Sequence, residues 1–145
     1  MRKVLLAATA VICGAALATG PALAQNKSIK IGFISTFSGP VAVIGEDMRN
    51  SVELALDHLG RKMGGKPVEV IYEDDQQKPD VGKQKTEKLV QSDKVDFIVG
   101  YIWSNVLLAS LKTAQDSQTF LISANAGPSQ LAGELCSPYV FSTSW

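Results

Sequence analysis

The sequence is poor in the residues from which most catalytic and metal centres are built. It contains one histidine, His58, which cannot form a multi-histidine metal site on its own. It also lacks the G-x-S-x-G motif of hydrolases, the G-x-G-x-x-G motif of dinucleotide-binding proteins and the G-x-x-x-x-G-K-[ST] motif of nucleotide-binding proteins. These absences predict a protein with no catalytic residues, no metal and no cofactor, and therefore not an enzyme.

The sequence has no excess of charge of either sign. Its 14 lysines and arginines balance 14 aspartates and glutamates. No basic stripe is available to hold a phosphate backbone, so nucleic acid is excluded as an expected partner.

The first 24 residues have the three parts of a secretory signal peptide. A basic start, Met1 to Lys3, precedes an apolar stretch over residues 4–18 and an A-x-A cleavage site at Ala22 to Ala24. The alternative, a membrane anchor, is disfavoured because the apolar run is shorter than the roughly 20 residues that a bilayer requires. We predict export to the periplasm.

The remaining residues, 25–145, are enough for one domain. Of the two cysteines, Cys13 leaves with the signal peptide, and Cys136 has no partner in the mature chain. An odd thiol in an exported protein calls for a partner elsewhere, which predicts one beyond Trp145. The end of the chain agrees, because residues 138–145 begin like a strand and stop without a cap or polar tail. We expect a fragment. The alternative, a natural end, would leave a strand edge exposed.

Apolar runs and turn residues alternate along the mature chain. A helical stripe of apolar residues runs from Met48 to Met63, and Gly60 supplies a left-handed stop. The patterns predict strands at 28–36, 68–72, 95–99, 119–123 and 139–142, with helices after the first three and a helical turn at 129–133. This alternation predicts an α/β fold, an open and mostly parallel sheet with helices on both faces.

Three loops are expected at the carboxyl edge of this sheet, where ligands of such folds bind. They are residues 38–40, 100–105 and 125–127, which are short, uncharged and contain glycine. Their hydroxyl, amide and backbone N–H groups suit a carboxylate held at helix ends. Ser104 has an alternative explanation, because serine is a good N-cap whether or not a ligand binds.

Two adjacent aspartates, Asp74 and Asp75, follow the second expected strand. A metal or phospho-acceptor site is one interpretation. Capping of the next turn by their side chains is the favoured one.

Taken in order, four segments resemble the leucine/isoleucine/valine-binding family of type I periplasmic binding proteins, the receptors of ABC importers. They are Ser38-Gly39-Pro40 followed by Gly45, Tyr72-Glu73-Asp74-Asp75, Asp96-Phe97-Ile98-Val99-Gly100, and Ile122-Ser123-Ala124-Asn125-Ala126. Members of this family have two α/β lobes that close on a ligand. The resemblance implies that residues 25–145 are the first lobe, cut as the chain enters the hinge.

The resemblance also implies roles for individual residues. Ser104 would donate its hydroxyl to a ligand carboxylate, and Asn125, Ala126 and Gly127 would present backbone groups. Ile44 matches a position where an aromatic side chain often covers the ligand. The neighbouring Ser38 and Asn105 complete the candidate site.

The sequence departs from the amino-acid receptors at two of these positions. Gly127 stands where they often have a hydroxyl residue for the ligand's ammonium, and Ile44 has no aromatic ring. An aromatic or aliphatic acid without an α-amino group is therefore an alternative ligand.

The resulting hypothesis is a receptor that delivers branched-chain-type amino acids or related carboxylates to a membrane permease of an ABC importer. A ligand-binding sensor of a signalling receptor is the alternative from another class.

Overall fold

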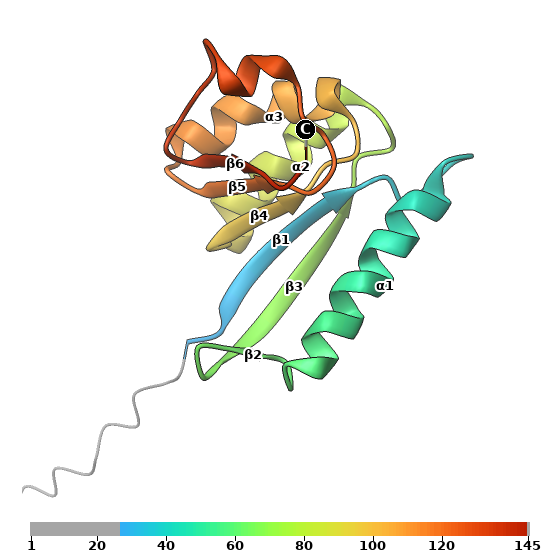
Figure 1. The fold of residues 1–145 in the computed structure, drawn as a ribbon, viewed down its shortest axis with the longest axis vertical. Helices are drawn as coiled ribbons and strands as arrows, with labels where there is room; N and C mark the ends of the chain where they lie inside the picture. The colour runs from blue at the N-terminus through green and yellow to red at the C-terminus, as the bar shows by residue number, and fades with distance from the viewer. Residues whose placement is uncertain (1–26, 145) are drawn as a thin grey trace, which may run out of the picture.

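The protein is a single mostly parallel β-sheet with helices on both faces (Figure 1). The structure, a computed structural model, describes residues 27–144, so the predicted signal peptide lies outside the described residues. The strand order is β2-β3-β1-β4-β5-β6, and only β2 is antiparallel to its neighbour. The strands are β1 (Ile29–Ser35), β2 (Lys62–Met63), β3 (Lys66–Asp74), β4 (Phe97–Gly100), β5 (Phe120–Ser123) and β6 (Val140–Ser142). The predicted fold class is confirmed.

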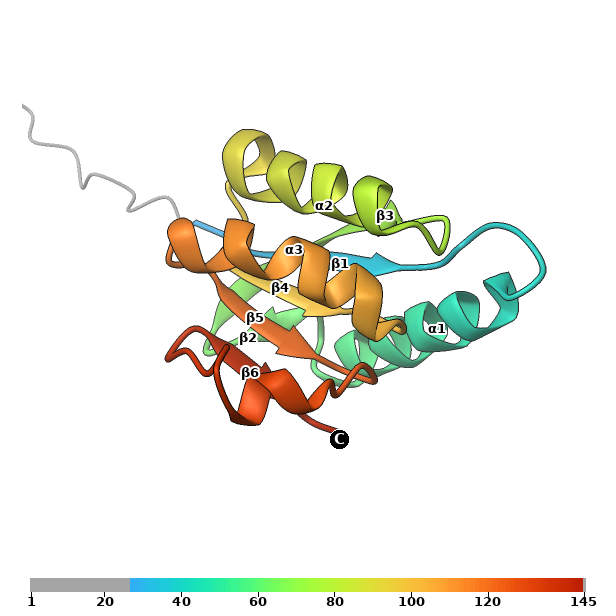
Figure 2. The same cartoon turned by 90° about the horizontal axis from the view of Figure 1, so that it is seen from above.

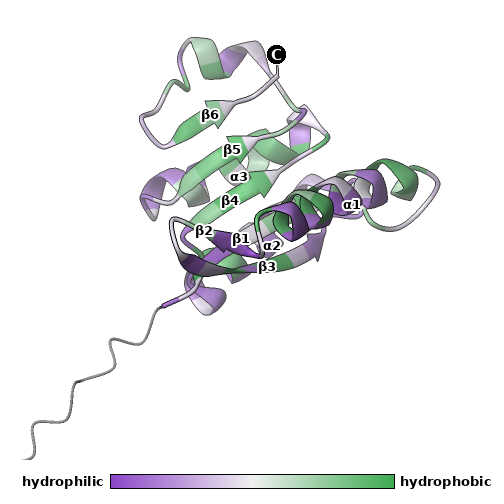
Figure 3. Cartoon of the chain, turned by 60° about the horizontal axis from the view of Figure 1, so that its bottom comes forward, coloured by the Kyte–Doolittle hydropathy of each residue, from purple (hydrophilic) through white to green (hydrophobic). Residues whose placement is uncertain are grey.

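The helices divide between the two faces of the sheet (Figure 2). Helix α1 (Ala42–His58) lies on one face, and α2 (Pro79–Lys88) and α3 (Ser104–Asp116) lie side by side on the other. The main core fills the space between the sheet and α2 and α3, where Ile34, Leu89, Ile98, Leu107 and Leu121 are fully buried. Strands β4 and β5 are correspondingly coloured as hydrophobic in Figure 3.

The apolar stripe predicted for the first helix is only partly correct. Helix α1 ends at His58, and Leu59 and Met63 lie outside it with 58% and 42% of their surface exposed. Gly60 has the left-handed φ of +61° that the sequence predicted. After it the chain turns into β2, a short strand that the sequence analysis missed and that pairs with Lys66 and Pro67.

Helix α1 is attached to the sheet largely by polar and aromatic contacts. The guanidinium carbon of Arg49 lies 4.1 Å from the centroid of the Phe37 ring and 4.9 Å from that of Tyr72, which are cation–π distances. The Tyr72 hydroxyl donates to Glu53 Oε1 at 2.6 Å. A helix held in this way needs fewer buried apolar residues, and Leu56 is the only large apolar residue of α1 that is fully buried.

Helix α1 covers only part of its face of the sheet. Phe97 stacks on Phe120 with a centroid distance of 6.1 Å, and Phe120 lies 6.0 Å from Phe141. Phe120 and Phe141 are 39% and 51% exposed. These rings belong to β4, β5 and β6, which lie toward the edge of the sheet away from α1, whereas α1 lies beside β1 and β3 (Figure 1).

Several predicted boundaries shift by a few residues. Strand β3 extends the predicted 68–72 at both ends, and β4 begins at Phe97 because Val95 still belongs to the connection. The second helix was predicted to run to about Ser92. The regular helix ends at Lys88 and continues as a π-helical turn, Leu89–Asp93, closed by Lys94 at a left-handed φ of 56°. No helix within residues 27–144 is both long enough and apolar enough to cross a membrane.

Glu73 links β3 to α2 through ion pairs with two lysines. These ion pairs predict that the stability of the fold decreases at acid pH. Its Oε2 lies 2.7 Å from Lys85 Nζ, and its Oε1 lies 2.7 Å from Lys88 Nζ. Burial alone would raise the pKa of Glu73, but the hydrogen bonds and charges of the two lysines outweigh it and lower this pKa. A carboxyl group whose pKa is lowered by folding stabilises the fold above its unfolded pKa and loses this effect as the pH falls through the folded value.

We therefore expect Glu73→Gln to be less stable than the unchanged protein at pH 7, with the gap closing below about pH 4.5. Urea denaturation between pH 3 and pH 7 measures this. Glu69→Gln, on an exposed position of the same strand, is the control and should show no such gap. A gap for Glu73→Gln that persists unchanged at pH 3 would contradict the assignment.

Candidate functional site

The strand order places a topological switch point between β1 and β4. The chain leaves β1 for α1 on one face of the sheet, and it leaves β4 for α3 on the opposite face (Figure 2). In open α/β sheets, ligands bind outside the carboxyl ends of the strands at such a point. The candidate site therefore lies where the loops after β1 and β4 diverge.

Hydrogen bonds tie the loops of this edge to one another. Trp103 Nε1, in the loop after β4, donates to Thr36 Oγ1 at the end of β1 over 3.0 Å. Asn125 Nδ2, in the loop after β5, donates to the carbonyl of Ile102 over 3.0 Å. The three loops that carry the predicted site residues are thus brought together along one edge. Their role in holding a ligand stays a prediction.

Ser104 is the first residue of α3 and not its cap. The N-cap position belongs to Trp103, whose side chain makes no capping hydrogen bond, so the N-cap explanation of Ser104 is wrong. Ser104 and Asn105 are exposed. Their backbone N–H groups find no partner within residues 27–144, and Asn105 Oδ1 accepts from the N–H of Val106 at 3.0 Å. The start of α3 therefore offers a hydroxyl and unpaired N–H donors at the switch point.

Ala126 differs from the expectation that it presents backbone groups outward. It is only 2% exposed. Its N–H donates to the carbonyl of Tyr101 at 3.1 Å, and its own carbonyl accepts a hydrogen bond from Ser123 Oγ. Ala126 therefore fixes its loop against the loop after β4, and its N–H is not available to a ligand.

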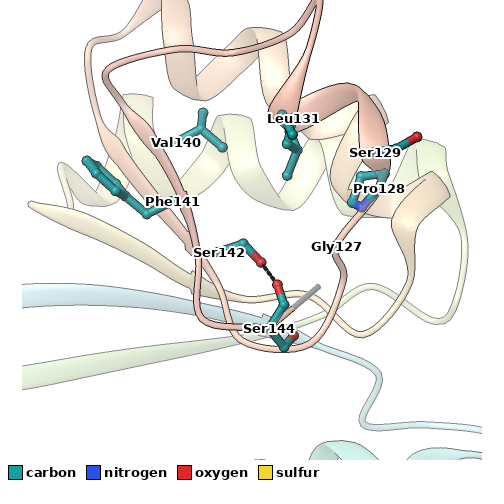
Figure 4. A pocket seen from close by; sticks show the side chains of 9 residues that line it. Gly127, Pro128, Ser129, Leu131, Val140, Phe141, Ser142 and Ser144 are labelled. Carbon is teal, nitrogen blue, oxygen red and sulfur yellow. Dashed lines mark hydrogen bonds between the residues drawn. The ribbon is translucent and has the colours of Figure 1, made fainter.

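Asn125 and Gly127 lie on either side of this buried anchor. Asn125 is exposed, and its backbone carbonyl accepts from Ser144 Oγ at 2.9 Å. Gly127 lines a cavity of about 440 Å³ between the loop after β5 and strand β6 (Figure 4). Its other walls include Pro128, Leu131 and Val140. The apolar lining suits the body of a ligand more than its charged group.

Ile44 lies in the first turn of α1 and is 40% exposed. It lines a second cavity, of about 320 Å³, together with Met48, Val99 and Asn125. This cavity joins α1 to the loop after β5, so Ile44 and Asn125 share one hollow despite their separation in sequence.

Ser38 is exposed in the loop after β1, close to the end of β3 where Asp74 accepts a hydrogen bond from the N–H of Phe37. Burial would raise the pKa of the Asp74 carboxyl, but hydrogen bonds from the Ser38 hydroxyl and from the N–H groups of Phe37 and Gln76 outweigh it, so this pKa is lowered. The role of Ser38 in holding a ligand stays a prediction.

The two aspartates cap the turn after β3, as the sequence analysis favoured. Asp74 Oδ1 accepts from the N–H of Gln76 at 2.9 Å, and Asp75 Oδ1 accepts from that of Gln77 at 2.8 Å. Residues 27–144 hold no group of three His, Cys, Asp or Glu side chains placed to bind a metal ion. Cys136 is exposed and makes no disulfide in the same range, so its predicted partner stays a prediction.

Sequence reasoning missed a second function of Asp75. The same Oδ1 accepts from Thr36 Oγ1 at 2.6 Å, and both residues are fully buried. The only available signal was that Thr36 and Asp75 each follow a strand directly. This position indicates a contact between the two residues only when the pairing of β1 with β3 is known, because that pairing sets Ser35 opposite Asp74.

Comparison with known proteins shows the family to which this chain belongs. A family model described as "Periplasmic binding protein" matches residues 28–145. The chain belongs to the periplasmic binding protein family. The resemblance to the leucine/isoleucine/valine-binding members of this family is confirmed by a relative from Brucella abortus (strain 2308), "Leu/Ile/Val-binding protein homolog 6", which is 30% identical over 146 residues. The match includes 100% of this chain and 36% of the relative, so the chain spans about a third of the length of that relative.

Solved structures of periplasmic binding proteins show the same fold. A solute-binding protein of an ABC transporter from R. palustris, in complex with benzoate, has a TM-score of 0.77 at 32% identity, covering 81% of this chain and 32% of that one. The branched-chain amino acid transporter substrate-binding protein from Streptococcus pneumoniae, in complex with isoleucine, has a TM-score of 0.73 at 30% identity, covering 80% and 33%.

Proposed function

We propose that this chain carries half of a ligand-binding cleft in the substrate-binding protein of an ABC importer. The ligand is a small carboxylic acid with an apolar body. The protein works by binding alone, in the periplasm, and delivers its ligand to a membrane permease. The observation that carries the proposal is the open start of α3, with Ser104 and two unpaired N–H groups at the switch point of the sheet.

The charge of the edge supports a carboxylate. The loops over residues 38–40, 101–105 and 124–128 contain no charged residue, so neutral donors would hold the acid group. Backbone N–H groups at a helix start are suited to this, because the helix dipole adds a partial positive charge there. Such donors are already in place before the ligand arrives and need little reorganisation.

Two ligand classes fit these neutral donors, and relatives of both classes exist. Isoleucine and benzoate, named in the two solved complexes, share a carboxylate and an apolar body but differ in the α-amino group. The same loops offer no carboxylate to pair with an ammonium, and Gly127 provides no hydroxyl. This favours acids without an α-amino group. Branched-chain amino acids are the second candidate, on the strength of the Brucella relative's name.

Replacing Ser104 by alanine tests the proposal. In the complete two-lobed protein, we expect Ser104→Ala to weaken binding of the preferred acid by about 1 to 3 kcal/mol, because the charged acceptor loses one donor once the second lobe has closed over it. Isothermal titration with benzoate and with isoleucine measures this. Ser92→Ala, an exposed serine in the turn after α2, is the matched control. Equal affinities in the two variants would remove Ser104 from the site, and no binding of either acid by the unchanged two-lobed protein would refute the ligand class.

A further inference from the structure

Trp103 bridges the switch point at which the proposed ligand binds. It belongs to the loop after β4 and directly precedes Ser104, yet its indole N–H reaches Thr36 at the end of β1. Its side chain is half-buried and packs against the main core, so part of the ring remains accessible. The largest apolar surface of this loop is thus held beside the start of α3.

The orientation of Trp103 is fixed by a chain of hydrogen bonds that begins in a buried carboxyl group. Thr36 and Asp75 are both fully buried. The Thr36 hydroxyl has one proton, which it donates to Asp75 Oδ1 at 2.6 Å, so its lone pairs are directed to the indole N–H. Asp75 is itself held by the N–H of Gln77 at 2.8 Å. The chain runs from the loop after β3 through β1 to the loop after β4.

The Asp75 carboxyl group accepts both of these hydrogen bonds through one oxygen, Oδ1. Its Oδ2 is buried and has no hydrogen-bond partner within residues 27–144. A buried polar atom without a partner is costly, so the arrangement is expensive for the fold alone. Its evident result is that the ring of Trp103 cannot turn freely.

We propose that Trp103 is a specificity-determining residue, whose indole forms the apolar wall against which the body of the bound acid packs. The inference rests on the proposed function. An acid group held at Ser104 and the start of α3 is one residue along the chain from Trp103, so its body lies within reach of the indole. Ile44, which lines the cavity beside Asn125, supplies no ring, and Trp103 provides one from the loop after β4.

A wall made of a fixed indole favours ligands with a ring of their own. Two aromatic rings gain from offset stacking or edge-to-face contact beyond the burial of apolar area, whereas a branched aliphatic body gains from burial alone. Thr36 and Asp75 are positioning residues in this arrangement, because they act on the ligand only through Trp103.

The test compares benzoate and isoleucine by isothermal titration on the complete two-lobed protein and four variants of it. Trp103→Leu removes the ring and is expected to weaken benzoate binding about tenfold more than isoleucine binding. Trp103→Phe keeps a ring without the N–H, so it should lose less benzoate affinity than Trp103→Leu. Thr36→Val keeps the shape of the side chain but breaks the hydrogen-bond chain, so it should match Trp103→Phe, and Thr36→Ser should restore the unchanged affinity.

A second measurement separates ligand contact from a purely structural role. In protein labelled with 5-fluorotryptophan, the ¹⁹F resonance that disappears in Trp103→Phe belongs to Trp103, and benzoate should shift it. Equal loss of both ligands in Trp103→Leu, with an unshifted resonance, would overturn the inference and leave the proposed function intact if Ser104→Ala still weakens binding. Failure of the unchanged protein to bind either acid would overturn both.

Discussion

Gly100→Ala is expected to destabilise the protein by about 3 to 5 kcal/mol, combining the strain of a left-handed conformation with a steric clash. Gly100 closes β4 with a φ of +120°, which side-chain-bearing residues rarely adopt. A Cβ atom there would lie 2.2 Å from the carbonyl oxygen of Ile34, which is backbone and cannot rotate away. The same oxygen accepts the N–H of Tyr101 at 2.8 Å, so moving it also breaks the contact between β1 and the loop after β4.

Gly39→Ala is the matched control for this prediction. Gly39 also has a left-handed φ, +77°, but nothing lies within 4 Å of the position of a Cβ. The Gly39→Ala substitution has the conformational cost without the clash, so we expect it to lower the free energy of unfolding by about 1 kcal/mol. Urea denaturation followed by circular dichroism gives both values. Similar losses in the two variants would show that the close approach of β1 and β4 at Gly100 is not a constraint.

The architecture could be predicted from the sequence because the buried parts of strands and helices are visible there as patterns of apolar residues. Strands such as β1 and β4 are short apolar runs bounded by glycine and polar residues, and each is followed by a loop and a helical stripe. The stop predicted at Gly60 is correct, but the apolar stripe of the first helix was extended too far, to Met63. At Gly60 the chain adopts a left-handed turn, and Met63 beyond it is exposed.

The composition of the candidate site could be predicted only in part. The convergence of the loops at Ser38, Ser104 and Asn125 follows from the rule that parallel strands end at one edge. Which donors remain unpaired does not follow from it. The N–H of Ala126 is used by Tyr101, and Ser104 begins α3 without capping it. These details depend on contacts between loops whose order in space is not their order in the chain.

The hydrogen-bond chain behind Trp103 is the clearest case of this limit. Thr36, Asp75 and Trp103 are far apart in sequence and meet only because β1 lies between β3 and β4. The capping of its own turn is enough to explain an aspartate at position 75. A single sequence therefore gives no reason to expect that Asp75 also binds Thr36. Knowledge of the strand order would have brought the three residues together.

Asp75→Ala is expected to destabilise the protein by about 3 kcal/mol, because two donors, Thr36 Oγ1 and the N–H of Gln77, lose their acceptor in a dry environment. The neighbouring Asp74 also accepts two hydrogen bonds, from the N–H groups of Phe37 and Gln76, each at 2.9 Å. Asp74 is only half-buried, so water can replace it more readily. We expect Asp74→Ala to cost about 1 kcal/mol.

Asp75→Asn separates the loss of the acceptor from the loss of the carboxyl group. The amide oxygen can take the place of Oδ1 and keep both hydrogen bonds, while the amide nitrogen takes the place of Oδ2, which has no partner to lose within residues 27–144. Denaturation of the three variants under one condition should therefore rank Asp75→Ala as the least stable, with Asp75→Asn well above it. If Asp74→Ala lost as much as Asp75→Ala, burial would not be what makes Asp75 important, and Thr36 would not depend on it to hold Trp103.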